Sequence, residues 1–151
     1  MNSIRVPIKR FLNGLGLPLP KYATSGSAGV DLMAAIDTSL ELFPGSRILI
    51  PTGLAIALPH GYEAQVRPRS GLAHKNGVTV LNAPGTIDAD YRGEISVILI
   101  NHGDKALLIE YGMRIAQIII APVNQVSWNE TTDLPDTARG ERGFGSTGIR
   151  S

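Results

Sequence analysis

The sequence predicts an all-β domain, folded as a β-barrel or a jelly roll. Short apolar segments recur along the chain between turn signals, and no window shows the period of a long amphipathic helix. Glycine (17 residues) and proline (10 residues) are abundant, which suits a fold with many turns. The expected strands are residues 4–8, 47–51, 54–58, 62–66, 78–81, 95–100, 106–109 and 115–123.

The first expected strand has the clearest pattern. Ile4, Val6 and Ile8 alternate with Arg5 and Pro7, which is the period-2 pattern of a half-buried strand. The segments that follow are short apolar runs bounded by glycine, proline and asparagine, and they are assigned to strands on that basis.

One short helix is expected at residues 70–75. Ser70 is placed as its N-terminal cap, because serine is among the residues preferred at that position.

Two of the expected strands are apolar on both faces. They are residues 95–100 and the stretch 115–121. One face of a strand in an antiparallel protein of this size normally meets water. Two explanations remain open: the second face packs against another subunit, or two sheets pack together within one chain.

Length and composition exclude several classes of protein. A chain of 151 residues is expected to form one domain that buries roughly 68–70% of its unfolded surface. Its 43% hydrophobic and 18% charged residues are typical of globular proteins. A net charge of +1 provides no basic surface for long nucleic acid. The absence of cysteine excludes disulfides and thiolate metal sites.

The location is expected to be cytoplasmic, with no membrane association. Residues 1–10 lack the continuous apolar stretch of a signal peptide, and no apolar run approaches the length of a transmembrane helix.

Two parts of the chain differ in character. Residues 1–128 form the expected β-barrel domain, and residues 129–151 form a C-terminal arm. Residues 129–138 are polar and contain Pro135, so they are expected to be an extended linker. Ten such residues span up to ~33–36 Å, which is enough to reach a neighbouring subunit.

The arm ends in the segment RGERGFGSTG, residues 139–148. Two interpretations apply to it: a disordered tail, or a loop that closes over an anion. In the second, the glycines let backbone N–H groups approach phosphate, Arg139 and the hydroxyls add donors, and Phe144 stacks on a base.

The most informative segment is residues 82–94, which we call the nucleotide hairpin. It lies between the expected strands 78–81 and 95–100 and carries two carboxylates, a tyrosine, an asparagine and an arginine. Pro84, Gly85 and Gly93 are turn residues, so an ordered loop is expected. An acid beside an aromatic side chain on a rigid loop can seat a small ring and position a water. The hypothesis is a nucleotide site.

Three other polar patches are weak signals individually. AGVDL at residues 28–32 carries a lone acid, Asp31. RSGLA at residues 69–73 places a guanidinium and a hydroxyl at a helix N-terminus, where anions bind readily. GMRIAQ at residues 112–117 enters an expected strand with Gln117 as a polar residue. The three histidines lack metal-ligand spacing, and the chain has neither a Ser/His/Asp set nor a GxxxxGK[ST] phosphate loop.

Taken in order, AGVDL, RSGLA, the nucleotide hairpin, GMRIAQ and RGERGFGSTG resemble the five motifs of the homotrimeric deoxyuridine triphosphatase (dUTPase) family. The resemblance covers almost the whole chain. It implies a jelly-roll β-barrel of the β-clip type that forms a homotrimer. Three active sites would lie at subunit interfaces, with the C-terminal arm exchanged between subunits.

The resemblance also implies an activity. Family members cleave dUTP to dUMP and pyrophosphate by attack of water on the α-phosphorus, which keeps uracil out of DNA and supplies dUMP for dTMP synthesis. Asp88 would be the general base and would hold the 3′-hydroxyl. The positions matching those that contact uracil and deoxyribose are Asn82, Gly85, Thr86, Ile87, Asp88, Tyr91, Ser96 and Phe144.

The remaining positions match residues that contact the triphosphate. Those at the α- and β-phosphates are Arg69, Ser70, Gly71 and Gln117, and those at the γ-phosphate are Arg139, Ser146 and Thr147. The implied cofactor is Mg²⁺, held mainly by the triphosphate. No direct protein ligand is expected, and Asp31 would act through water.

The chain departs from the family pattern at three positions. Arg142 stands where glycine is common, Ser96 where Lys or Met is common, and Arg67 where a small or apolar residue is usual. Two other functions are weighed: a dCTP deaminase of the same fold, and a non-hydrolysing nucleotide sensor. At the position where this chain has Arg-Ser-Gly, the deaminases have an Arg-Ser-Ser pattern. The pairing of Asp88 with Tyr91 favours hydrolysis.

Overall fold

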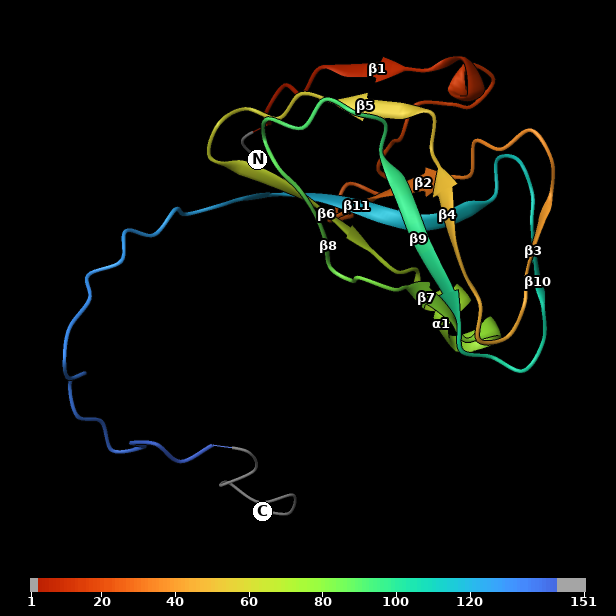
Figure 1. Ribbon diagram of the computed structural model, residues 1–151. Coiled ribbons are helices and arrows are strands. Elements are labelled where there is room, and N and C mark those ends of the chain that lie inside the picture. Colours follow the sequence, from red (N-terminus) through yellow and green to blue (C-terminus); the bar gives the residue numbers. More distant parts are fainter. Residues whose placement is uncertain (1–2, 144–151) are drawn as a thin grey trace.

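A computed structural model describes residues 3–143 of the chain (Figure 1). Its strands are β1 (Ile8–Arg10), β2 (Val30–Met33), β3 (Leu40–Leu42), β4 (Arg47–Pro51), β5 (Leu54–Ile56), β6 (Tyr62–Arg67), β7 (Val78–Val80), β8 (Gly85–Ile87), β9 (Ser96–Asn101), β10 (Leu107–Ile109) and β11 (Arg114–Pro122). A single turn of 3₁₀ helix, η1 (Leu12–Gly14), and one short α-helix, α1 (Ser70–Asn76), complete the regular structure. The prediction of an all-β fold is confirmed.

The strands form two main antiparallel sheets and two small ribbons. One sheet has the order β2-β11-β6-β8 and the other the order β4-β9-β7, while β1 pairs with β5 and β10 pairs with β3. Alternate side chains of both main sheets enter one hydrophobic core, whose most deeply buried members include Leu32, Ile50, Leu99, Ile109 and Ile115. This sandwich of antiparallel strands agrees with the expected jelly roll.

The first expected strand is placed wrongly. Residues 4–8 were expected, but pairing with β5 begins at Ile8, which lies opposite Ile56. The carbonyl of Pro7 accepts a hydrogen bond from Ala57 N at 3.0 Å, yet proline has no N–H to donate in return. The alternation of Ile4 and Val6 therefore does not extend the ladder.

Four elements were absent from the expected set. They are β2, β3, β8 and η1. Strand β8 lies inside the nucleotide hairpin, and its three residues pair with β6 and not with the strands that flank the hairpin in sequence. Strands β7 and β9, which the hairpin joins, pair with each other in the opposite sheet.

The expected helix is present as α1, but its cap is different. Arg69 occupies the N-cap with extended backbone and no side-chain cap, and Ser70 is the first helical residue. Gly77 ends the helix in the left-handed conformation, with φ 67°, and its N–H bonds to the carbonyl of Ala73.

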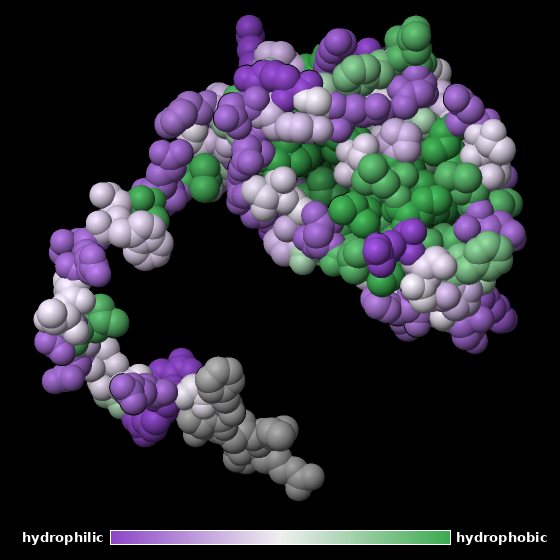
Figure 2. Space-filling model, in the orientation of Figure 1, coloured by the Kyte–Doolittle hydropathy of each residue, from purple (hydrophilic) through white to green (hydrophobic). Residues whose placement is uncertain are grey.

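The outer face of the β4-β9-β7 sheet is apolar. Val97 and Leu99 of β9 point into the core, whereas Ile98 and Ile100 lie half-buried on the other face. Leu49, the cross-strand partner of Ile98, is 60% exposed. Figure 2 shows apolar side chains gathered over β9 and β4. Two sheets packed within one chain thus account for one face of β9 only.

After β11 the chain leaves the barrel and extends away from it (Figure 1). Residues 124–143 contain no helix or strand, and Val126, Trp128 and Leu134 are exposed there. The division of the chain at residue 128 stays a prediction. The expected roles of Phe144, Ser146 and Thr147 fall on residues outside the described part. Within residues 3–143, no helix has the length and apolarity that crossing a membrane requires.

Candidate functional site

A row of polar side chains crosses three strands of the larger sheet. Asp31 of β2 lies opposite Gln117 of β11, and Gln117 lies opposite Arg67 of β6. Cross-strand partners share a face of the sheet, and Val66, the neighbour of Arg67, points into the core. The row therefore lies on the outer face.

Arg69 is tied into this row by its charge. Its Nε lies 2.9 Å from Asp31 Oδ1, and its Nη1 donates to the carbonyl of Arg114 at 3.2 Å. Arg114 in turn places Nη1 3.3 Å from Asp31 Oδ2. One half-exposed carboxylate thus aligns two guanidinium groups that remain open to solvent on one side.

Gln117 and the start of α1 complete this cluster. Gln117 Nε2 donates to the carbonyl of Pro68 at 3.0 Å, so the amide is oriented by the segment that leads into Arg69. Gly29 gives Gln117 room, since a Cβ there would lie 3.0 Å from its Oε1. Ser70 and Gly71 are exposed in the first turn of α1, where backbone N–H groups have no partner within the helix.

The nucleotide hairpin forms a second cluster. Gly85 pairs with Val66 of β6 and Ile87 pairs with Ala64. Ile87 is buried, whereas Thr86 is exposed. Only the backbone of Ile87 is therefore available to a ligand at this position. The Asn82 amide nitrogen lies 3.3 Å from where a Cβ on Gly85 would stand, so Asn82 is adjacent to β8.

The turn that follows β8 fixes Tyr91. Tyr91 N donates to Asp88 O at 3.1 Å, and Tyr91 OH donates to Glu94 O at 3.0 Å. The ring lies against Gly93, where a Cβ would come 2.4 Å from the hydroxyl oxygen. Arg92 closes the turn by donating to the carbonyls of Ala89 and Tyr91 at 2.6 and 2.8 Å. The turn is ordered by its own hydrogen bonds.

Asp88 and Thr86 open into a shallow hollow at the edge of the larger sheet. The other lining residues come from the β5–β6 connection, from β6 and from the segment after β11: His60, Gly61, Tyr62, Glu63, Ala89, Asp90, Val123, Asn124 and Gln125. Three of these lining groups are carboxylates. In residues 3–143, however, no group of three or more His, Asp or Glu side chains is arranged to hold a metal ion.

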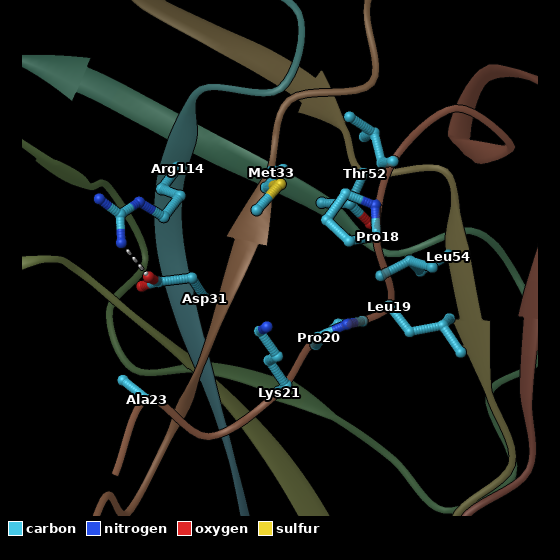
Figure 3. Close-up of a pocket in the computed structure, with 11 residues that line it drawn as sticks. Pro18, Leu19, Pro20, Lys21, Ala23, Asp31, Met33, Thr52, Leu54 and Arg114 are labelled. Atoms are coloured by element: carbon cyan, nitrogen blue, oxygen red, sulfur yellow. Dashed lines mark hydrogen bonds and ion pairs between the residues drawn. The ribbon is translucent and has the colours of Figure 1, made fainter.

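A second pocket lies beside the Asp31 cluster (Figure 3). Its lining is mostly apolar and comes from the segment 17–23, β2, the β4–β5 turn and β11. Figure 3 shows Asp31 and Arg114 at its edge, with the carboxylate directed toward the guanidinium. None of the hairpin residues lines this pocket.

The two clusters are far apart within one chain. Strands β8 and β6 run antiparallel, and Ile87 of β8 lies opposite Ala64 of β6. Asp88 follows Ile87 by one residue toward one end of β6, whereas Arg69 follows Ala64 by five residues toward the other end. Six residues of extended chain therefore separate the level of Asp88 from that of Arg69, about 20 Å at ~3.3 Å per residue. One chain does not bring the expected base and the expected phosphate ligands together.

Two expected residues lie apart from both clusters. Ser96 is the first residue of β9 and lies opposite Pro51. Arg139 lies in the extended arm, where its Nε donates to Arg142 O at 2.9 Å and Arg142 Nε donates to Arg139 O at 3.0 Å. The departure at residue 142 thus pairs with Arg139 in this conformation.

Some residues of these clusters were not in the expected set. Arg114 lies within GMRIAQ, three residues before Gln117, a spacing that puts two side chains on opposite faces of a regular strand. The irregularity in register between Arg114 and Ala116 accompanies the contact of Arg114 with Asp31, and nothing in the sequence signals it. Glu94 was noted only as part of the hairpin, yet its Oε1 accepts hydrogen bonds from Gly53 N at 2.7 Å and Asn13 Nδ2 at 2.9 Å. No local sequence signal points to the contact with Asn13.

Comparisons with known proteins agree with the five motifs. The dUTPase family model matches residues 16–148. A deoxyuridine 5′-triphosphate nucleotidohydrolase of Rhizobium rhizogenes is 60% identical over 142 residues, covering 93% of this chain and 91% of its own. The corresponding protein of Rickettsia prowazekii is 61% identical over 149 residues, covering 99% and 100%.

Solved structures agree as well. The Staphylococcus bacteriophage 80alpha dUTPase with dUPNHPP superposes with a TM-score of 0.83 at 25% identity, covering 97% of this chain and 100% of that one.

Proposed function

Because the chain belongs to the dUTPase family, its activity is the hydrolysis of dUTP, and we propose that each reaction takes place where Asp88 of one copy meets Arg69 of another. Water attacks the α-phosphorus, the bond to the bridging oxygen breaks, and dUMP and pyrophosphate leave. Nothing in the described residues favours a dCTP deaminase or a non-hydrolysing sensor over this reaction.

One observation carries the proposal that the site is shared. The base must reach the α-phosphorus that the phosphate ligands hold, yet about 20 Å of strand lies between Asp88 and Arg69 in one chain. Arg69 cannot swing across this gap, because Asp31 and the Arg114 carbonyl anchor its guanidinium on the far side of β11. A second copy supplies the missing half.

Two further features support assembly into a homotrimer. The outer face of the β4-β9-β7 sheet exposes Leu49 beside Ile98 and Ile100, and apolar surface of this kind is stabilised by about 25 cal/mol for each Å² removed from water. The arm leaves its own barrel after β11 and extends away from it (Figure 1). The number three follows from the family resemblance.

At the reacting end, Asp88 is the proposed general base. Its carboxylate is exposed, so it can accept the proton of a water and hold the 3′-hydroxyl. Assistance of this kind typically contributes ~10²–10⁴-fold to the rate.

At the nucleoside end, Tyr91 and the hairpin backbone are proposed to set specificity. The ring of Tyr91, fixed over Gly93, would lie under deoxyribose and leave no room for a 2′-hydroxyl. Asn82 and the backbone from Gly85 to Asp88 would pair with the uracil edge. A site built for particular hydrogen bonds can reject a mismatched base by ~10⁴–10⁵, whereas complementing a methyl group is worth only ~10–200-fold. Thymine must therefore be excluded by steric clash.

The phosphates are proposed to bind at the Asp31 cluster. Arg69 and Gln117 point polar groups outward beside the first turn of α1, and Ser70 and Gly71 add backbone N–H donors. Arg139 of the arm, with Ser146 and Thr147, would reach the γ-phosphate, and Phe144 would stack on uracil. One base–aromatic stack is worth ~1–3 kcal/mol, which would help to hold the arm closed over bound nucleotide.

Mg²⁺ is the proposed cofactor. The donor set fits an ion held mainly by the triphosphate, because the one carboxylate of the phosphate cluster, Asp31, already accepts hydrogen bonds from two arginines. Asp31 would contact the ion through water. When bound, Mg²⁺ would neutralise charge on the phosphate oxygens.

Mixed assemblies test the shared site. Asp88→Asn and Arg69→Ala are each expected to be nearly inactive alone. When the two variants are unfolded together and refolded as mixed oligomers, a site with Asp88 from one chain and Arg69 from the other is intact. Random mixing gives roughly a quarter of such sites in a cyclic assembly. Pyrophosphate release should recover accordingly, whereas no recovery in verified mixed oligomers would place both residues in one chain's site.

A further inference from the structure

Three segments that are remote in sequence meet at the end of the nucleotide hairpin. Glu94 Oε1 accepts hydrogen bonds from Gly53 N at 2.7 Å and from Asn13 Nδ2 at 2.9 Å. Asn13 Nδ2 also lies 3.2 Å from the carbonyl of Ala35. All of these contacts are partly buried, and neither Asn13 nor Gly53 was assigned to substrate above.

The two donors are held in a rigid unit. Gly14 of η1 packs directly on Gly53 of the β4–β5 turn: a Cβ on Gly14 would lie 2.6 Å from Gly53 O, and a Cβ on Gly53 would lie 2.4 Å from Gly14 Cα. Phe11 N donates to Gly53 O at 2.9 Å and closes the unit from the other side. Asn13 and Gly53 N are therefore presented to Glu94 at a fixed separation.

The same glutamate holds Tyr91. Its carbonyl accepts the hydrogen bond from Tyr91 OH, while its carboxylate is gripped by Asn13 and Gly53. Tyr91 is 47% exposed, so core packing does not fix its ring. The hydroxyl tether and the contact with Gly93 determine where the ring lies.

We propose that Asn13, acting through Glu94, is a positioning residue. It fixes the position of the Tyr91 ring relative to the sugar of the substrate, and this position sets the preference for deoxyribose over ribose. This rests on the proposed place of Tyr91 under the sugar. Hydrogen bonds to a charged carboxylate are roughly twice as strong as neutral ones, which suits an anchor that must resist the push of a 2′-hydroxyl. Without the hydrogen bonds to Glu94, the Tyr91 ring can move away from the sugar and leave room for the 2′-hydroxyl of ribose.

The test measures kcat/KM for dUTP and UTP in purified full-length variants. Asn13→Ala should lower the dUTP:UTP ratio by about tenfold, the scale expected for one lost hydrogen bond to a charged group. Glu94→Ala should lower the dUTP:UTP ratio by a similar factor. Glu94→Gln keeps an oxygen that can accept both hydrogen bonds but loses the charge that strengthens them, so its dUTP:UTP ratio should fall less than that of Glu94→Ala.

Asn101→Ala is the matched control for lost stability. Asn101 is a buried amide at the opposite end of β9, and its Nδ2 donates to Leu42 O at 2.9 Å and to Lys105 O at 2.8 Å. Its replacement should lower the melting temperature at least as much as Asn13→Ala does, yet leave the dUTP:UTP ratio unchanged. A generic loss of stability would instead move the ratio in both variants.

If Asn13→Ala does not fold, Tyr91→Phe still tests whether the link between Glu94 and Tyr91 sets the dUTP:UTP ratio. It removes the hydroxyl tether and leaves the grip on Glu94 intact, so its ratio should fall. Where both variants fold, combining it with Asn13→Ala should cost less than the two changes added together, because both act through one link.

Failure of the two proposals can be told apart. Wild-type enzyme that hydrolyses dUTP and UTP equally would remove Tyr91 from its proposed role. A wild-type preference for dUTP, retained in full by folded Asn13→Ala and Glu94→Ala, would overturn the role of Asn13 alone.

Discussion

Among single residues, the carboxylates of Asp31 and Asp88 have opposite surroundings. Asp31 is bonded to Arg69 and Arg114 and is committed to aligning them. Asp88 is exposed and, among the residues that the structure describes, has no cationic side chain within 4.0 Å. A carboxylate without a competing cation is free to accept a hydrogen bond from water. The geometry thus separates a positioning acid from a candidate base.

The exchange Asp88→Asn tests this assignment. The amide has nearly the same shape, so dUTP binding should persist, while turnover should fall by at least ~10² because the proton acceptor is lost. Binding is measured by calorimetry and turnover by pyrophosphate release. Asp104→Asn, which removes the same charge from an exposed loop, should leave both unchanged. Near-normal turnover in Asp88→Asn would exclude Asp88 as the base.

Among the elements, the nucleotide hairpin and helix α1 are each fixed by a contact with a segment remote from them in sequence. Strand β8 joins the sheet that contains β6, although β7 and β9 on either side of it belong to the other sheet. Helix α1 is fixed where it stops: Gly77 O accepts a hydrogen bond from His102 N at 2.9 Å, which docks the helix end on the β9–β10 loop. The start of the same helix carries Ser70 and Gly71, which belong to the proposed phosphate site.

Gly77 should therefore be the sensitive point of α1. In Gly77→Ala, the left-handed backbone costs about 1–2 kcal/mol, and the new Cβ would stand 2.5 Å from Gly103 N. Gly45→Ala is the matched control, since Gly45 has φ 76° and nothing within 4 Å of a Cβ. Urea unfolding at one protein concentration should show a larger loss of stability for Gly77→Ala. Equal losses would mean that the docking contact adds nothing.

In the molecule as a whole, one chain does not bring the parts of the proposed site together. It separates its two site clusters, leaves one sheet face apolar and sends its arm away from the barrel. Association of copies would account for all three features. A neighbouring copy would supply the missing cluster, cover the exposed face and receive the arm.

A charge placed on that face should block assembly. Leu49→Asp puts a carboxylate where an apolar interface is proposed, and burying it unpaired would cost several kcal/mol. The variant should sediment as a smaller species and lose dUTP hydrolysis together with its assembly. Leu108→Asp changes a leucine of similar exposure, 49% against 60%, on strand β10, and should remain assembled and active. A fully active Leu49→Asp monomer would contradict the shared site.

Local patterns in the chain predicted the all-β fold, and several of the residues that form the two polar clusters lie in motifs visible in the sequence. Strands such as β4 and β6 were found because alternation and turn residues are local properties of a chain. Asp31, Arg69 and Gln117 were found because they sit in short motifs. Their joint position follows from register, with Asp31 opposite Gln117, which no motif states.

The tertiary structure alone decided which remote groups meet and which do not. Residues 4–6 alternate as a strand does, yet Pro7 lacks the N–H that would extend the ladder with β5. Asn13 and Glu94 are 81 residues apart and touch only because η1 packs on the β4–β5 turn. Asp88 and Arg69 are 19 positions apart in sequence yet about 20 Å apart along β6. Contacts of this kind depend on the path of the backbone in space, whereas local pattern reports only which face of its own element each residue occupies.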